Sequence, residues 1–174
     1  MNKIKLGKYI TEYSVKNKNN KKIPVYSVTN SEGFCTEYFS KDVSSKNRNT
    51  YKIVPYGYFA YNPSRINVGS IDWQRKEKEV MVSPLYNVFK LSDQIDNQYL
   101  YYFLKSDVGL FYINSLSSGS VRNNLKLSSL KEFYIPDISI EKQKECSKII
   151  DILSNLISNR KQQLTNQNLN VLLA

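Results

Sequence analysis

The C-terminal stretch of the chain, residues 141–174, contains neither glycine nor proline. Such a stretch can form one uninterrupted helix, about 50 Å long at roughly 1.5 Å per residue. Its apolar residues recur at the i, i+3, i+4, i+7 spacing of a helix face. They are Cys146, Ile149, Ile150, Leu153, Leu156, Ile157 and Leu164. We expect a helix this long to pack on a second copy or on a partner. The alternative is an ordinary amphipathic helix that folds back on its own domain.

The heptad pattern of this stretch divides it into two parts. One seam position holds Cys146, Leu153, Arg160 and Gln167, and the other holds Ile149, Leu156 and Gln163, so the seam is apolar early and polar late. The pattern leaves open whether the chain dimerises alone. Its polar part could instead need other subunits, or lie against the partner's domain.

The rest of the chain is long enough for one globular domain. With 174 residues and 41% hydrophobic content, we predict a domain at 1–137 and a long helix at 138–174. No apolar run could span a membrane, and the N-terminus shows no secretory signal. Cys35 and Cys146 lie far apart, without the spacing of a zinc site or a disulfide framework. This usage fits a reducing cytoplasm.

Charge points to an anionic partner. The net charge is +10, which favours nucleic acid over an anionic membrane surface. There is no histidine, which excludes histidine-based catalysis and histidine metal ligands. Abundant Tyr, Asn, Ser and Lys suit contacts with phosphates and base edges, although an AT-rich genome would also enrich Asn, Lys, Ile and Tyr.

The element pattern predicts an α+β fold, with a curved antiparallel or barrel-like sheet and short helices before the long helix. Predicted strands lie at 23–29, 34–39, 51–54, 58–61, 68–71, 79–90 and 131–135. Pro84 interrupts the longest, which indicates an edge strand or a bulge. Asp96 is the expected N-cap of a helix that Gly109 could divide, and Ser139 could cap the long helix.

Two loops carry candidate binding residues. Residues 61–70 place Asn62, Ser64, Arg65 and Asn67 between apolar strands. Arg suits guanine and Asn suits adenine, but a structural turn in which Asn62 bonds its own backbone explains the pattern at least as well. Residues 117–126 form a second donor-rich loop, which is either a phosphate clamp or an exposed connector.

Acidic residues form no evident site. Asp72, Glu77 and Glu79 alternate with basic residues, as in a solvated charged strip. We find neither the convergent carboxylates of a metal-dependent nuclease nor a nucleotide or S-adenosylmethionine motif. We therefore predict no metal, no cofactor and no catalytic residue.

In their order along the chain, several motifs resemble the specificity subunit of Type I restriction-modification systems. The resemblance rests on residues 4–7, 59–69, 82–89, 119–127, 130–136 and 141–143. Before the helix, the chain has Asp137-Ile138-Ser139 after Pro136, where the family usually has further prolines. A full specificity subunit carries two recognition domains and two spacer helices, so the chain resembles a half-subunit.

This resemblance implies a non-catalytic DNA-recognition role. The domain would read one half of a bipartite target, and the helix would pair antiparallel with a second copy. Modification methyltransferase subunits would dock around it, with a restriction-motor subunit as a further partner. We assign DNA contact to Tyr26, Ser27, Thr29, Asn30, Asn62, Ser64, Arg65, Asn67, Arg122, Asn123, Asn124 and Lys126.

Two other functions remain as alternatives. One is a regulatory half-subunit that pairs with specificity or modification subunits without reading DNA. The other is a small nuclease, which would depend on Asp72 or Glu79.

Overall fold

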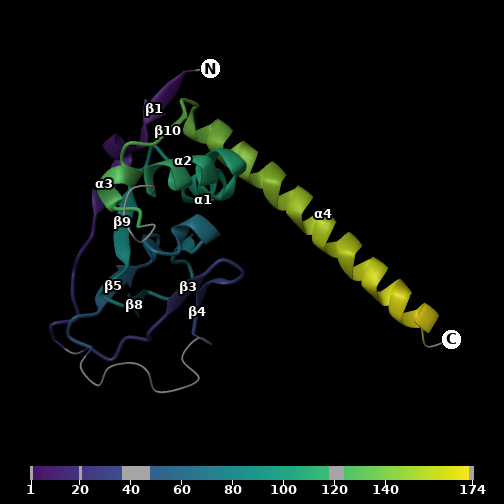
Figure 1. The fold of residues 1–174 in the computed structure, drawn as a ribbon, viewed down its shortest axis with the longest axis horizontal. Coiled ribbons are helices and arrows are strands. Elements are labelled where there is room, and N and C mark those ends of the chain that lie inside the picture. Colours follow the sequence, from purple (N-terminus) through teal and green to yellow (C-terminus); the bar gives the residue numbers. More distant parts are fainter. Residues whose placement is uncertain (1, 20, 37–47, 118–123, 173–174) are drawn as a thin grey trace.

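The computed structural model describes residues 2–19, 21–36, 48–117 and 124–172, with side chains described up to residue 166. Short strands and three short helices form a mixed α/β domain, and one long helix leaves it (Figure 1). The α+β prediction is confirmed. The described strands form four separate sheets, and no closed barrel is seen among them.

The largest sheet is antiparallel, in the order β2-β9-β6-β7. Three two-stranded antiparallel pairs surround it: β1 with β10, β3 with β4, and β5 with β8. The bounds are β1 Lys3–Lys5, β2 Ile10–Glu12, β3 Ser27–Thr29, β4 Gly33–Cys35, β5 Lys52–Pro55, β6 Phe59–Tyr61, β7 Ile71–Trp73, β8 Glu79–Val82, β9 Asn87–Leu91 and β10 Tyr134–Pro136.

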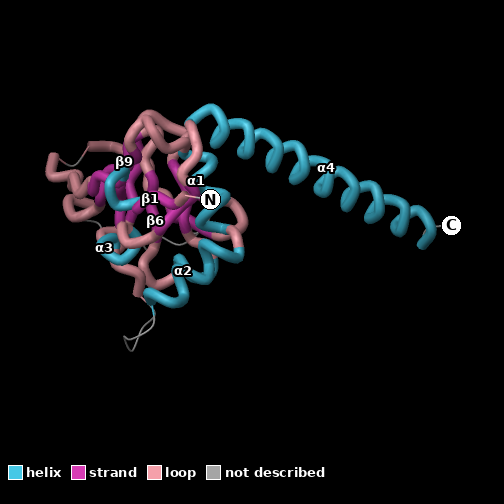
Figure 2. The backbone as a smooth tube through the Cα atoms, turned by 90° about the horizontal axis from the view of Figure 1, so that it is seen from above, coloured by secondary structure: helices cyan, strands magenta, loops and turns pink. Residues whose placement is uncertain are grey.

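The central strand β6 is buried on both faces, and its side chains alternate between two cores. On β6, Phe59 and Tyr61 face the larger core, and Ala60 faces a smaller one. The rings of Phe59 and Phe89 stack with centroids 5.0 Å apart. Helices α1 (Asn97–Lys105), α2 (Asp107–Ser117) and α3 (Leu127–Leu130) contribute to the larger core (Figure 2).

The predicted strand 79–90 is wrong as one element. It is two strands in two different sheets, because Pro84 lies in an exposed turn that Tyr86 closes with a 3.1 Å bond from its N–H to the Ser83 carbonyl. We expected an edge position or a bulge: β8 is an edge strand, since its sheet has two strands, whereas β9 is interior to its sheet. Residues 68–71 likewise do not form one strand: a short 3-10 helix, Ile66–Val68, ends at Gly69 (φ +84°) before β7 begins.

The other element predictions are partly confirmed. Strand 23–29 shortens to β3. Strand 34–39 gives β4, and its last three residues lie outside the described residues. The predicted strand 131–135 becomes the turn after α3 followed by β10. The carboxylate of Asp96 accepts a 2.9 Å bond from the Tyr99 N–H, which confirms it as the N-cap of α1.

The division between α1 and α2 falls at Ser106, not at Gly109. Ser106 has extended backbone, and its hydroxyl accepts a 3.2 Å bond from the Gly109 N–H. Gly109 is buried in the first turn of α2, where an added Cβ would lie 2.1 Å from the Phe103 carbonyl oxygen. The glycine therefore allows close packing of the two helices and does not break either.

The long helix α4 (Ile140–Leu172) is confirmed, and Ser139 caps it with a 3.3 Å bond to the Lys142 N–H. Hydrogen bonds from its own backbone N–H and from the Ser139 hydroxyl lower the pKa of Glu141 in the first turn. Figure 1 shows the helix crossing α1 and then running away from the domain. It does not fold back on its own domain. Within the described residues, no helix combines the length and apolar character needed to span a bilayer.

Candidate nucleic-acid interface

A polar cleft forms where the turn after β3 meets the loop between β6 and β7. Its volume is about 510 Å³. We call it the polar cleft, and its lining residues are Ser27, Val28, Thr29, Asn30, Ser31, Asn62, Arg65, Val68, Ser70 and Tyr86. Five of the predicted DNA-contact residues thus share one surface: Ser27, Thr29, Asn30, Asn62 and Arg65.

The floor of the polar cleft is fixed by buried bonds to Val28 of β3. The Tyr86 hydroxyl accepts a 3.2 Å bond from the Val28 N–H, and the Ser70 hydroxyl donates a 2.5 Å bond to its carbonyl. Val28, Ser70 and Tyr86 are all buried. Because both backbone groups of Val28 are held by side chains from other strands and turns, β3 cannot slide relative to the 62–70 loop without breaking them.

The loop that carries Arg65 is held in place by a buried side chain and by hydrogen bonds to its own backbone. Ile66 is buried in the larger core, and the Arg65 N–H donates a 3.0 Å bond to the Asn62 carbonyl. The Asn62 side-chain oxygen accepts a 3.0 Å bond from the Ser64 N–H, so the structural turn that the sequence suggested is present. The Arg65 side chain is exposed and has no bonding partner among the described residues.

The segment before α3 is fastened to this loop. The Ser64 hydroxyl donates a 2.8 Å bond to Asn124 Oδ1, and the Leu125 N–H donates a 3.1 Å bond to the Pro63 carbonyl. The Tyr61 hydroxyl donates to the Leu125 carbonyl at 3.0 Å and accepts from Asn87 at 2.9 Å. Burial raises the pKa of this hydroxyl, so it stays a neutral donor. The two candidate loops therefore meet, at Ser64 and Asn124.

The remaining predicted contacts lie elsewhere. Tyr26 is half-buried against Phe34, with ring centroids 6.4 Å apart, and it does not line the polar cleft. Asn67 is half-buried in the 3-10 helix, and Lys126 is exposed before α3. Arg122 and Asn123 lie outside the described residues.

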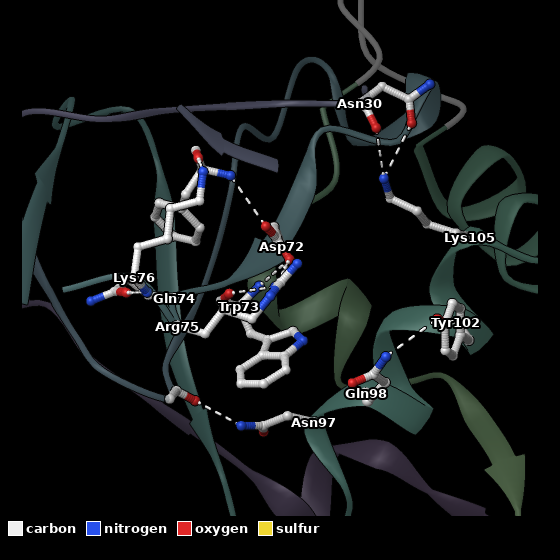
Figure 3. Close-up of polar contacts among 12 residues, drawn as sticks. Asn30, Asp72, Trp73, Gln74, Arg75, Lys76, Asn97, Gln98, Tyr102 and Lys105 are labelled. Carbon is white, nitrogen blue, oxygen red and sulfur yellow. Dashed lines mark hydrogen bonds and ion pairs between the residues drawn. The ribbon is translucent and has the colours of Figure 1, made fainter. Parts of the chain in front are cut away.

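One basic residue at the polar cleft was missed by the sequence reasoning. Lys105, at the end of α1, donates from Nζ to the Asn30 carbonyl at 2.9 Å and to Asn30 Oδ1 at 3.3 Å (Figure 3). Its position in an amphipathic helix 75 residues away gave no signal. Only the packing of α1 against β7 brings it here.

The charged strip predicted at residues 72–79 is wrong for Asp72, which is buried. Asp72 Oδ2 accepts from the Phe34 N–H at 3.1 Å, and Oδ1 accepts from the Trp73 N–H and from Arg75, each at 2.8 Å (Figure 3). The carboxylate therefore joins β4 to β7. Arg75 also lies over the Trp73 ring, 4.9 Å from its centroid.

We expect Asp72→Asn to lower the free energy of unfolding by roughly 2 kcal/mol, because an amide NH₂ would face one of these donors and leave a buried N–H unsatisfied. Urea denaturation checks this, with exposed Glu77→Gln as the matched control. Equal stability of both variants would contradict the role of Asp72 as a structural acceptor.

These acidic groups do not converge on a metal. Glu79 lies on β8, in a different sheet from Asp72, and its nearest cation is Lys21 at 3.8 Å. Across the described residues, no three His, Cys, Asp or Glu side chains gather where they could hold a metal ion. Cys35 and Cys146 are both free thiols.

The predicted partner face of α4 is exposed beyond its first turns. Ile149, Leu153 and Leu156 are each at least 50% exposed, and Cys146 is half-buried. The other members of the face are Ile150, Ile157 and Leu164, at 36%, 56% and 46% exposure. We call these seven residues the apolar stripe.

A different face of α4 contacts the domain, through Gln143, Ser147 and Asp151. Gln98 donates a 2.8 Å bond to Asp151, and the Tyr102 hydroxyl also donates to that carboxylate. At about 100° per residue, the centre of this docking face lies roughly a third of a turn from the centre of the apolar stripe. The domain therefore leaves the stripe uncovered.

Comparisons with known proteins give a family match. Residues 2–167 match the family described as "Type I restriction modification DNA specificity domain". The chain is 37% identical over 71 residues to the Type I restriction enzyme MjaIX specificity subunit of Methanocaldococcus jannaschii, a match that covers 41% of this chain and 16% of that subunit.

Two solved structures share the fold. The HsdS subunit from Thermoanaerobacter tengcongensis matches with a TM-score of 0.64 at 14% identity, over 91% of this chain and 43% of that one. A chain from a study of complex assembly and conformational transition of the type I R-M system matches with a TM-score of 0.60 at 15% identity, over 92% and 40%. The chain thus spans less than half of each relative. With the family match extending over nearly its whole length, the chain belongs to the Type I restriction-modification DNA specificity domains.

Proposed function

We propose that this chain is a sequence-specific DNA-binding component that reads one half of a bipartite target through the polar cleft. The observation that carries the proposal is the gathering of Arg65, Asn62 and Asn30 on one rigid, donor-bearing surface. Arg and Asn are side chains that read base edges, and a net charge of +10 supplies the attraction to phosphates. Family membership supports the same role.

The arrangement of α4 supports a second part of the proposal. An exposed apolar stripe on a helix about 50 Å long fits antiparallel pairing with a second copy. Two domains related by a two-fold axis would read an interrupted palindrome, and the helices would set the distance between half-sites. Modification methyltransferase subunits would dock around this pair, and a restriction-motor subunit would join them. In this proposal catalysis belongs to those subunits.

Arg65→Ala tests the reading role directly. If the guanidinium contacts a guanine edge, its loss should cost about 1–3 kcal/mol of binding free energy on the cognate sequence and little on other sequences. The measurement is a fluorescence-anisotropy titration of the chain with its modification subunits, on selected and scrambled duplexes at several salt concentrations. Lys78→Ala, which removes an exposed cation that does not line the polar cleft, is the control.

The salt dependence separates the two kinds of contact. A phosphate contact by Arg65 would weaken all duplexes equally and reduce the slope of log K against log salt by about 1. A wild-type complex with no preference between selected and random duplexes would contradict the proposed function, and would favour the regulatory half-subunit.

A further inference from the structure

The amide of Asn30 is held in one orientation by Lys105. Lysine has three donors and no acceptor, so the side-chain oxygen of Asn30 must face Nζ and Nδ2 must point away from it. Figure 3 shows both oxygens of Asn30 turned toward Lys105. Asn30 itself lines the polar cleft, so the amide offers its NH₂ group on the side away from α1.

Two other contacts fix this pair. Lys105 Nζ lies 4.8 Å from the centroid of the Tyr101 ring, one helical turn earlier on α1. The Asn30 side chain lies against Gly69, where an added Cβ would be 2.2 Å from Oδ1. The glycine therefore leaves the space that the amide occupies, and Lys105 determines which of its ends faces the polar cleft.

The second asparagine of the polar cleft is oriented in the same sense. The Asn62 side-chain oxygen accepts the bond from the Ser64 N–H, so one acceptor of this amide also serves the protein backbone. Arg65 belongs to the same lining, and its side chain carries donors only. The hydroxyls of Ser27 and Thr29 can donate or accept. The side chains that line the polar cleft therefore offer a ligand more hydrogen-bond donors than acceptors.

We propose that the polar cleft selects guanine, and that Lys105 is the positioning residue that sets this choice through Asn30. Guanine presents two acceptors, N7 and O6, in the major groove, whereas adenine and cytosine present an amino group there. An asparagine that reads adenine must accept from that amino group, and the Asn30 oxygen would do so in competition with the Lys105 cation. The proposal rests on the proposed DNA-reading function and refines it.

The experiment uses the full chain assembled with its modification subunits. Binding selection from a random duplex library should enrich guanine at one position of the half-site, and Asn30→Ala should lose the preference there. Replacing that guanine by 7-deazaguanine, which lacks the N7 acceptor, should weaken wild-type binding by roughly tenfold. Lys105→Met keeps the length of the side chain but removes the donor. It should reduce the preference for guanine over adenine at that position by roughly tenfold.

Matched variants separate positioning from simple loss of charge. Lys105→Arg should keep the guanine preference, because it restores a donor to the Asn30 oxygen. Lys8→Met, which removes an exposed lysine that makes no bond to Asn30, should leave the guanine preference unchanged. Circular dichroism of each variant confirms that it is folded.

The outcomes distinguish a failure of the guanine preference from a failure of the proposed DNA-reading function. Selective wild-type binding with adenine, cytosine or thymine at the Asn30-dependent position would overturn the inference and leave DNA reading intact. The same holds if Lys105→Met keeps the guanine preference. A wild-type complex without any sequence preference would overturn both.

Discussion

Leu153→Glu is expected to weaken self-association of the chain by more than about 100-fold, which corresponds to roughly 3 kcal/mol. Leu153 lies at the centre of the apolar stripe and is 53% exposed in the single chain. Burial of a leucine in an antiparallel helix pair contributes about 1.5–3 kcal/mol. A carboxylate without a partner at the same seam adds a desolvation cost of several kcal/mol.

The matched control is Asn155→Glu, which adds the same charge two residues further along. At about 100° per residue it lies on the opposite side of the helix from the stripe. Sedimentation equilibrium of the chain, alone and with modification subunits, gives the association constants. If both variants associate like the wild type, the stripe is not the dimer surface. A wild-type chain that stays monomeric under both conditions would contradict the homodimer.

The elements that the sequence predicted well are those with a strong local signal. The long helix, its Ser139 cap and the Asp96 cap follow from local residues, and all three are confirmed. The gathering of Asn62 and Arg65 also follows from proximity in the chain. Local chemistry determines these features, so one sequence contains enough information.

The errors have a common physical cause, which is that the contacts involved join residues far apart in the sequence. Residues 79–90 alternate as one strand would, yet β8 pairs with β5 and β9 pairs with β2 and β6. Asp72 resembled a surface charge because its neighbours in sequence are charged, but Phe34, 38 residues away, supplies the N–H that keeps it buried. Lys105 was missed for the same reason.

The faces of α4 show a different limit of prediction from sequence. Periodicity predicted the apolar stripe as one face of the helix, and in the structure the domain docks on another face of α4. Sequence periodicity could not separate these, because the docking face is polar: Gln143, Ser147 and Asp151 carry it. An amphipathic pattern predicts where apolar residues lie. It gives no information about a helix face that binds its domain through hydrogen bonds of polar side chains.

Gln143→Ala is expected to lower the free energy of unfolding by about 3 kcal/mol. Gln143 is only 1% exposed, and its side chain joins the start of α4 to Gln94 and Asp96 of the domain. Its Oε1 accepts from the Asp96 N–H at 2.9 Å, and its Nε2 donates to the carbonyls of Gln94 at 3.1 Å and Ile138 at 3.0 Å. Truncation leaves three backbone groups without these partners, at about 1–3 kcal/mol for each that stays buried.

Gln143→Met separates the polar effect from the cavity, since methionine fills a similar volume without the hydrogen bonds. If unsatisfied groups cause the loss, Met should be destabilised nearly as much as Ala, whereas exposed Lys148→Ala should be neutral. Urea denaturation gives the stabilities, and small-angle X-ray scattering gives the direction of α4. A Met variant as stable as the wild type would mean that the packing of the side chain at this position, and not its hydrogen bonds, holds the helix. If the bonds do hold it, a half-site spacing set by α4 would depend on one buried amide, because a change of angle at Gln143 is amplified along the whole helix.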